Sequence, residues 1–299
     1  MSFVLLSGVL MGLIQTGQAA GDDAYPRAEL LVEPADLARA EVAKQFVILD
    51  ARPRRQYDEG HVPGAVLVDA SAWAKAFGDG QDSEGWSRRI GEAGIDRQSK
   101  VVVYDNSSNK DAARIWWILG HWGADDARLL NGGWAGWQSG NLPVETEASR
   151  PKQAEFQARA RAKRLATKDL LLDSLSGASG KLQVVDARSE GEFCGTEKLN
   201  NKRAGAIPGA THLEWSDLVD PETQRFKGPD QLRELFDSAG IDLEQPAVAH
   251  CQSGGRASVM AFGLELMGAR DVRNYYASWS EWGNADDTPI EPGKPADEK

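Results

Sequence analysis

Cys251 and the residues after it have the types and spacing of a thiol-based active site. The run from Val248 to Ser258 (VAHCQSGGRAS) leads from a short apolar stretch into a tight turn and then a helix-like segment. Backbone N–H groups of such a loop converge on one point, and the positive end of the following helix adds to their field. This environment favours the thiolate, the reactive form of cysteine. We therefore expect Cys251 to act as a nucleophile.

The rest of the loop is expected to hold an anion beside the sulfur. Gly254 and Gly255 can adopt positive φ and let amides point inward. Arg256 can either aim its donors at a bound anion or brace the loop. Ser258 can cap the helix or donate to the sulfur, whereas His250 is expected to be an ordinary strand residue whose side chain points away from its neighbour's.

Arg188 is expected to supply a second cation from a neighbouring strand. It follows the apolar stretch that ends at Asp186, and the carboxyl ends of parallel strands meet at one sheet edge. The alternative is a structural ion pair with Asp186 or Glu190. The substrate-binding set predicted from the sequence is Arg188, Gln252, Ser253, Gly254, Gly255, Arg256 and Ser258.

The chain contains an internal repeat with a spacing of about 145 residues. The segment around Asp50-Ala51-Arg52 matches the one around Asp186-Ala187-Arg188, and Val62–Ala65 matches Ile207–Ala210. Asp105 stands where the second copy has Cys251. Because a carboxylate cannot do thiol chemistry, we expect the first copy to be catalytically inactive. Arg52 recurs where no cysteine exists, so part of the Asp-Ala-Arg pattern must be structural.

Each copy alternates short apolar runs with longer amphipathic stretches, which predicts an α/β fold with a parallel sheet flanked by helices. The predicted domains cover residues 28–146 and 164–293, with a linker over 147–163 and a loop insertion near 193–203 in the second copy. The predicted strands are 46–49, 100–104, 182–185 and 247–249, and the predicted helices are 34–44, 112–122, 230–239 and 257–267. Most tryptophans are expected to fill the core and the domain contact.

The N-terminus has the pattern of a secretory signal peptide. The apolar run from Phe3 to Ile14 is too short to span a membrane, and Gly17-Gln18-Ala19 precedes a polar segment. We expect cleavage after Ala19 and a periplasmic protein, although no Lys or Arg occurs before Arg27. The alternative is an uncleaved tail on a cytoplasmic protein.

The composition limits the kinds of molecule that the protein is expected to bind. The net charge of −11 argues against a broad nucleic-acid surface, so any anion site must be local. The four histidines lack metal-ligand spacing, and we expect neither a metal nor an organic cofactor. The mature chain is expected to be a monomer without a membrane segment. Cys194 is interpreted as incidental, the alternative being a redox partner of Cys251.

The landmarks resemble the rhodanese family in its tandem two-domain form. The upstream signature is similar to the segments from Asp50 to Arg52 and from Tyr57 to Ala65, and the downstream one to the segment from Asn131 to Trp137. The resemblance implies that Cys251 accepts sulfur as a persulfide, that the loop surrounds it and that the site lies between the domains. Relatives that use mercaptopyruvate usually carry a second arginine where this chain has Glu192, which favours thiosulfate as the donor.

We therefore expect a thiosulfate sulfurtransferase that passes sulfur from a small anionic donor to a thiophilic acceptor such as cyanide or a thiol. The alternatives are a mercaptopyruvate sulfurtransferase, a non-catalytic persulfide carrier and a purely structural tandem. A cysteine phosphatase shares the His-Cys…Arg pattern, but its loop has one residue more than the four between Cys251 and Arg256.

Overall fold

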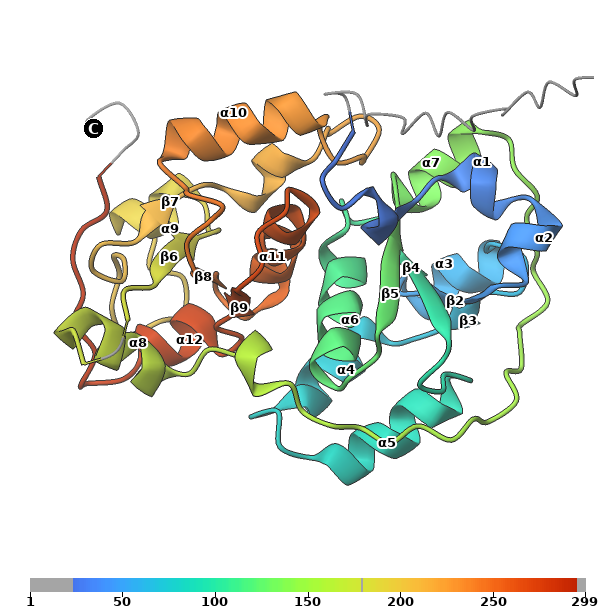
Figure 1. The fold of residues 1–299 in the computed structure, drawn as a ribbon, viewed down its shortest axis with the longest axis horizontal. Helices are drawn as coiled ribbons and strands as arrows, with labels where there is room; N and C mark the ends of the chain where they lie inside the picture. Colours follow the sequence, from blue (N-terminus) through green and yellow to red (C-terminus); the bar gives the residue numbers. More distant parts are fainter. Residues whose placement is uncertain (1–23, 179, 295–299) are drawn as a thin grey trace, which may run out of the picture.

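The computed structural model describes residues 24–178 and 180–294. The expected signal peptide at residues 1–19 therefore lies outside the described residues. The chain forms two α/β domains, each a parallel sheet flanked by helices, which confirms the predicted fold class (Figure 1). Helices α6 (Lys110–His121) and α11 (Gly255–Leu266) pack against each other between the two sheets. The interface thus lies next to the helix that begins at the Cys251 loop.

The first domain is built on a five-stranded sheet in the order β1-β5-β4-β2-β3, with every pair parallel. Its central strand is buried along almost its whole length, which explains its continuous apolar sequence. The strands are β1 (Leu31–Val32), β2 (Phe46–Asp50), β3 (Val66–Leu67), β4 (Lys100–Tyr104) and β5 (Asp126–Leu130), and the other helices are α1 (Pro34–Leu37), α2 (Ala40–Ala43), α3 (Arg54–Glu59), α4 (Ala70–Phe77), α5 (Ser83–Glu92) and α7 (Gly133–Ser139).

The second domain repeats this arrangement with a four-stranded sheet in the order β7-β6-β8-β9. A parallel bridge between Leu165 and Asn274 takes the place that β1 has in the first domain. The strands are β6 (Gln183–Asp186), β7 (Thr211–His212), β8 (Ala247–His250) and β9 (Val272–Asn274), and the other helices are α8 (Lys168–Ser176), α9 (Glu190–Cys194), α10 (Pro229–Ala239) and α12 (Ser278–Trp282). Strand β8 lies between β6 and β9, so the Cys251 loop leaves the middle of the sheet.

The predicted strands, and three of the four predicted helices, agree with the structure to within two residues at each end. The single helix predicted over 34–44 is wrong, because the structure has the two short helices α1 and α2 there. Arg39 takes an extended conformation between them, with ψ at 123°. Helix α2 has no fully buried residue and contacts the core through the partly buried Ala43, so little apolar burial holds it in line with α1.

Aromatic side chains fill the contact between the domains. Trp116 meets Phe262 edge-on at 4.9 Å between ring centroids, and Trp117 stacks on Tyr276 at 5.1 Å. Such pairs bury large apolar areas and add specific ring contacts. The domain contact is therefore part of one continuous core that includes Cys251.

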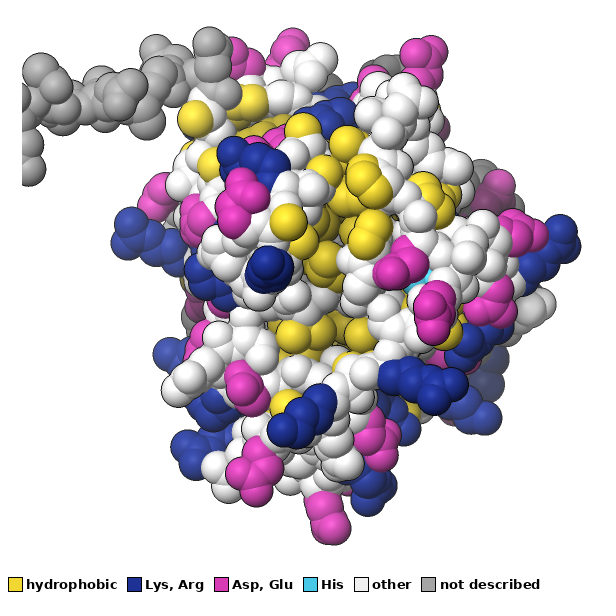
Figure 2. Space-filling view, turned by 90° about the vertical axis from the view of Figure 1, so that its right-hand side faces the viewer, with side chains coloured by type: hydrophobic (Ala, Val, Ile, Leu, Met, Phe, Trp, Pro, Cys, Tyr) yellow, Lys and Arg dark blue, Asp and Glu magenta, His cyan; other side chains and the backbone are white. Residues whose placement is uncertain are grey.

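The outer side of the first domain carries both apolar and charged side chains. Figure 2 shows hydrophobic side chains gathered in a strip on this side, with acidic and basic side chains interspersed around it. None of the helices in the described ranges is both long and apolar enough to cross a bilayer.

His121 makes the stability of the molecule dependent on pH. It is 1% exposed, and burial, opposed by the Gly80 carbonyl and assisted by the charge of Arg164, lowers its pKa to about 4. An unfolded histidine has a pKa of about 6.5, so the unfolded chain takes up this proton first as the pH falls. Neutral His121 therefore makes its full contribution to the unfolding free energy above about pH 6.5. Between that pH and about pH 4 the contribution falls by about 1.4 kcal/mol per pH unit.

We therefore expect His121→Gln to flatten the decline in unfolding free energy between pH 6.5 and 4.5, as measured by urea denaturation. Above pH 7.5 the variant and the wild type should show parallel pH dependence, which serves as the control. Equal slopes in the acidic range would contradict this assignment.

Candidate active site

Cys251 lies at the carboxyl end of β8 and is 1% exposed. Its N–H donates to Oγ of Ser278 at 3.1 Å, and its carbonyl accepts from the N–H of Trp279 at 2.9 Å. Both partners lie at the start of α12, after the neighbouring strand β9. The backbone that carries the thiol is thus fixed from the next connection of the sheet, as expected for a site at a strand end.

The two glycines of the loop leave room for different neighbours. Gly254 has φ at +81°, and a Cβ there would lie 2.6 Å from the ring of Tyr276. Gly255 begins α11 and does not take positive φ, contrary to the expectation from the sequence. A Cβ on Gly255 would lie 2.9 Å from Cζ of Arg114 in the first domain. The Gly-Gly pair therefore admits two side chains close to the loop backbone.

Arg256 joins the thiol to a carboxylate. Its Nη1 and Nη2 bind the two oxygens of Glu192 at 2.6 and 2.9 Å. Burial acts to lower the pKa of Arg256, but the Glu192 hydrogen bond and the negative charge of Cys251 outweigh it and raise the pKa. Burial acts to raise the pKa of Glu192, but Arg256 outweighs it and lowers that pKa. Arg256 is thus a permanent cation that serves both Cys251 and Glu192.

Arg188 lies in the structural ion pair that the sequence analysis gave as the alternative. Its Nη2 is 2.6 Å from Oδ2 of Asp186 and donates to the Gly205 carbonyl at 2.7 Å, and its guanidinium covers the ring of Trp279. The side chain is 1% exposed. The pair engages Nε and Nη2 of Arg188, so an anion beside Cys251 could use these two donors only by breaking it. The role of Arg188 in binding the donor stays a prediction.

The first domain contains the same ion pair without a cysteine. Arg52 binds Asp50 at 2.6 Å, donates to the Gly60 carbonyl at 2.7 Å and covers the ring of Trp134. Because these side-chain contacts of Arg188 recur at Arg52, the Asp-Ala-Arg pattern has a structural role in both copies. In the second domain His250 also lies against this pair, with Nε2 at 3.3 Å from Asp186. His250 is a buried strand residue, as expected.

The remaining predicted residues brace the loop. Gln252 exchanges two hydrogen bonds with Asn201, at 3.0 and 3.1 Å, so the insertion docks onto the loop. Ser258 is buried and donates to the Gly254 carbonyl at 2.8 Å. Asn274 donates to both the Gly254 carbonyl and Ser258. The hydroxyl of Ser258 thus contacts the loop backbone, not the sulfur.

Ser253 is the exposed residue of the loop, and its carbonyl accepts from Nη1 of Arg114 at 3.0 Å. The same nitrogen donates to the hydroxyl of Tyr276 at 2.9 Å. Burial raises the pKa of Tyr276, and the negative charge of Cys251 adds to this while Arg114 opposes it. A cation from the first domain therefore lies beside the catalytic loop of the second.

The equivalent loop of the first domain surrounds its own carboxylate. Asp105 accepts hydrogen bonds from the N–H groups of Ser107, Asn109, Asp111 and Ala112, at 2.8 to 3.0 Å, and from the hydroxyl of Ser107. The loop after the central strand is thus built to hold a negative group. Sequence reasoning identified Asp105 as a replacement for cysteine but did not foresee that it fills this cradle.

Four residues that shape the site were missed in the sequence: Arg114, Asn201, Asn274 and Ser278. Asn274 ends β9, the neighbour of β8, and Ser278 follows it, so the rule that sites gather at strand ends could have identified both. Arg114 gives no such signal, because its position depends on how the two domains pack.

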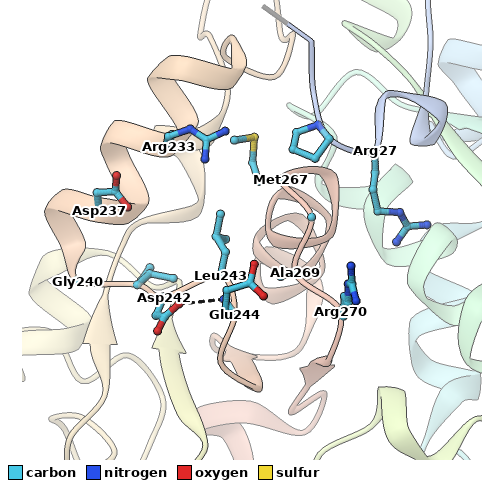
Figure 3. A pocket seen from close by; sticks show the side chains of 13 residues that line it. Arg27, Arg233, Asp237, Gly240, Asp242, Leu243, Glu244, Met267, Ala269 and Arg270 are labelled. Atoms are coloured by element: carbon cyan, nitrogen blue, oxygen red, sulfur yellow. Dashed lines mark hydrogen bonds between the residues drawn. The ribbon is translucent and has the colours of Figure 1, made fainter. Parts of the chain in front are cut away.

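A broad cleft of about 1040 Å³ lies away from this site. It is lined by residues of α10, of the following loop and of the segment after α11, among them Arg233, Asp237, Glu244 and Arg270 (Figure 3). Cys251 is not among its lining residues. The cleft lies at the carboxyl end of α11, whereas the catalytic loop precedes the amino end of that 12-residue helix. The chemistry of Cys251 is therefore separate from this cleft.

The arrangement around Cys251 suits nucleophilic attack by sulfur. A thiol, a paired guanidinium and the amino end of a helix can stabilise negative charge on sulfur during formation of a covalent intermediate. Cys194 ends α9, two residues after Glu192, and is not joined to Cys251 by a disulfide. Within residues 24–178 and 180–294, no group of three or more His, Cys, Asp or Glu side chains is arranged to hold a metal ion.

Comparison with known proteins shows the same organisation. The model of the rhodanese-like domain matches residues 33–140 and 168–285. The thiosulfate sulfurtransferase of Azotobacter vinelandii is 31% identical over 273 residues, which cover 90% of this chain and 99% of that protein. The thiosulfate sulfurtransferase of Corynebacterium glutamicum is 36% identical over 80% of this chain and 82% of its own.

A relative with another substrate in its name is similarly close. The human 3-mercaptopyruvate sulfurtransferase is 33% identical over 77% of this chain and 79% of its own. Among solved structures, the anaerobic ergothioneine biosynthesis enzyme from Chlorobium limicola, in complex with trimethyl histidine, has a TM-score of 0.78 at 24% identity, over 91% of this chain and 72% of its own. That likeness concerns the fold. The family match and the full-length relatives together show that this chain belongs to the rhodanese family, whose domain it carries in two tandem copies.

Proposed function

We propose that this protein is a thiosulfate sulfurtransferase that works through a persulfide on Cys251. The observation that carries the proposal is the position of Cys251, at the base of a loop that leads into α11 and beside the Arg256 guanidinium. Relatives at 31–36% identity named thiosulfate sulfurtransferase support it.

The reaction has two steps. The Cys251 thiolate attacks the outer sulfur of thiosulfate and forms a new S–S bond. The bond between the two thiosulfate sulfurs breaks, and sulfite leaves with the electron pair of that bond. A thiophilic acceptor such as cyanide or a thiol then attacks the outer sulfur of the persulfide. The S–S bond of the persulfide breaks, and its electron pair stays on Sγ of Cys251, which becomes a thiolate again. Arg256 stabilises negative charge on the sulfur in both steps, and the N–H groups at the start of α11 favour the anionic donor.

Glu192 favours thiosulfate over mercaptopyruvate as the donor. Its carboxylate takes both Nη atoms of Arg256, so this guanidinium is not available to clamp the carboxylate of a 2-oxo acid. A mercaptopyruvate carboxylate placed there would also meet the charge of Glu192. Thiosulfate needs only one small sulfur at the nucleophile, which suits a thiol that is 1% exposed.

Mercaptopyruvate sulfurtransfer is the second candidate, because human and Escherichia coli relatives at 33% and 31% identity carry that name. A persulfide carrier without turnover is a third, since it would use the same cysteine. A phosphatase is disfavoured by the length of the loop, which has four residues between Cys251 and Arg256 where cysteine phosphatases have five.

We also propose that the protein acts after export to the periplasm, without a metal or an organic cofactor and as a monomer. The apolar run from Phe3 to Ile14 and the small residues before Gly21 support export.

The first prediction about the proposed reaction concerns the nucleophile. Cys251→Ser should reduce thiocyanate formation from thiosulfate and cyanide by about a thousandfold or more, because a hydroxyl cannot accept the sulfane sulfur. Mass spectrometry of the wild type after thiosulfate alone should show one added sulfur on the peptide that contains Cys251. Cys194→Ser is the matched control and should retain that added mass. Hydrolysis of p-nitrophenyl phosphate without thiocyanate formation would falsify the sulfurtransferase assignment, and a stable persulfide without turnover would favour the carrier.

The second prediction concerns donor choice. In the wild type, kcat/KM should be higher for thiosulfate than for mercaptopyruvate. Glu192→Gln removes the charge but keeps the shape, so Arg256 becomes available to a donor carboxylate. We expect this variant to raise kcat/KM for mercaptopyruvate relative to thiosulfate by about tenfold, the effect of one charged hydrogen bond.

Glu190→Gln changes an exposed carboxylate on the same helix and is the matched control for overall charge. It should leave the ratio of the two kcat/KM values at the wild-type level. A ratio that stays constant in Glu192→Gln, or that shifts equally in both variants, would refute the role of Glu192.

A further inference from the structure

The catalytic loop is held from both sides of the domain interface. Within its own domain, Asn274 and Ser278 bind the backbone of Gly254 and Cys251. From the first domain, Arg114 on α6 reaches across and donates to the carbonyl of Ser253. Ser253 stands between the nucleophile and the glycines, so this contact acts on the middle of the loop.

Arg114 has little freedom at this position. One nitrogen, Nη1, bonds both the Ser253 carbonyl at 3.0 Å and the Tyr276 hydroxyl at 2.9 Å, and the guanidinium lies 5.5 Å from the centre of the Tyr276 ring. The guanidinium also packs so close to Gly255 that a Cβ there would force it to shift. The loop has a glycine at Gly255 although its φ there is not positive. A glycine at position 255 therefore leaves the space that the Arg114 guanidinium occupies.

We propose that Arg114, supplied by the catalytically silent domain, is a positioning residue for the catalytic loop of the other domain. The inference builds on the proposed sulfur transfer and gives the first domain a direct part in it. Arg114 holds the Ser253 peptide so that the N–H groups of the loop and Arg256 stay aligned with the sulfur of Cys251. It also places a positive charge beside Tyr276, whose ring covers Gly254.

A contact on the silent side of the interface provides the control. There the second domain reaches the Asp105 loop through Gln224, whose carbonyl accepts from Nδ2 of Asn109 at 2.8 Å. The next residue, Arg225, forms an ion pair with Glu33 of the first domain. Arg225→Met thus removes an interdomain arginine without touching the catalytic loop.

The test compares Arg114→Met, Arg114→Lys and Arg225→Met in the full chain. One readout is amide hydrogen exchange of the peptide that contains Gln252 to Ala257, and the other is the single-turnover release of sulfite from thiosulfate. Arg114→Met should speed exchange of this peptide and slow sulfite release, each by about tenfold or more, since a charged hydrogen bond is lost. Arg114→Lys should recover most of the sulfite rate, because one ammonium can reach both acceptors of Nη1.

Arg225→Met should leave the sulfite rate near that of the wild type and speed exchange in the peptide around Asp105 instead. If Arg114→Met proves unstable, Arg114→Gln takes its place with the same expected result. The proposal is overturned if both readouts stay at wild-type values in the Arg114 variants, or if Arg225→Met slows sulfite release equally. A wild type that releases no sulfite defeats the proposed function, whereas the exchange data still decide whether Arg114 holds the loop.

Discussion

A buried ion pair at the carboxyl edge of each sheet fixes the frame on which everything else is placed. Asp186 and Arg188 are both at most 1% exposed, and a charge at such depth persists only when it is paired and hydrogen-bonded. Burial acts to raise the pKa of Asp186, but His250 and Arg188 outweigh it and hold that pKa well below its usual range. The pair ties strand β6 to the Gly205 carbonyl and to Trp279, whose N–H in turn holds the carbonyl of Cys251.

The two domains share a fold but carry different side chains at the start of the loop that follows the central strand. In the first, Asp105 brings its own negative charge into the loop, and four N–H groups bind it. In the second, Cys251 stands at that position and Arg256 compensates charge on the sulfur. Equivalent loops of the two sheets therefore hold a carboxylate in one copy and a thiol in the other.

The sequence predicted those features of the structure that depend on patterns within short stretches of the chain. The repeat, the apolar strands and the run around Cys251 predicted both sheets and the position of the nucleophile, because these depend on short-range patterns. For Arg188 the sequence could not decide between a donor-binding cation and a structural ion pair, because it does not show that Asp186 and Gly205 engage the side chain. Arg114 reaches the loop from the other domain, so spacing along the chain could not reveal it. Glu192 was noted in the sequence, but its pairing with Arg256 depends on how α9 packs and was not predicted.

The close approach of Arg114 to Gly255 has a consequence for how the molecule can change over time. A side chain added at Gly255 would have to be matched by a shift of the Arg114 guanidinium on α6, so the two positions constrain each other across the domain interface. A fragment with the C-terminal domain alone would lack Arg114 and would leave the Ser253 carbonyl and the Tyr276 hydroxyl without this partner. Substitutions at the two positions are therefore expected to be coupled.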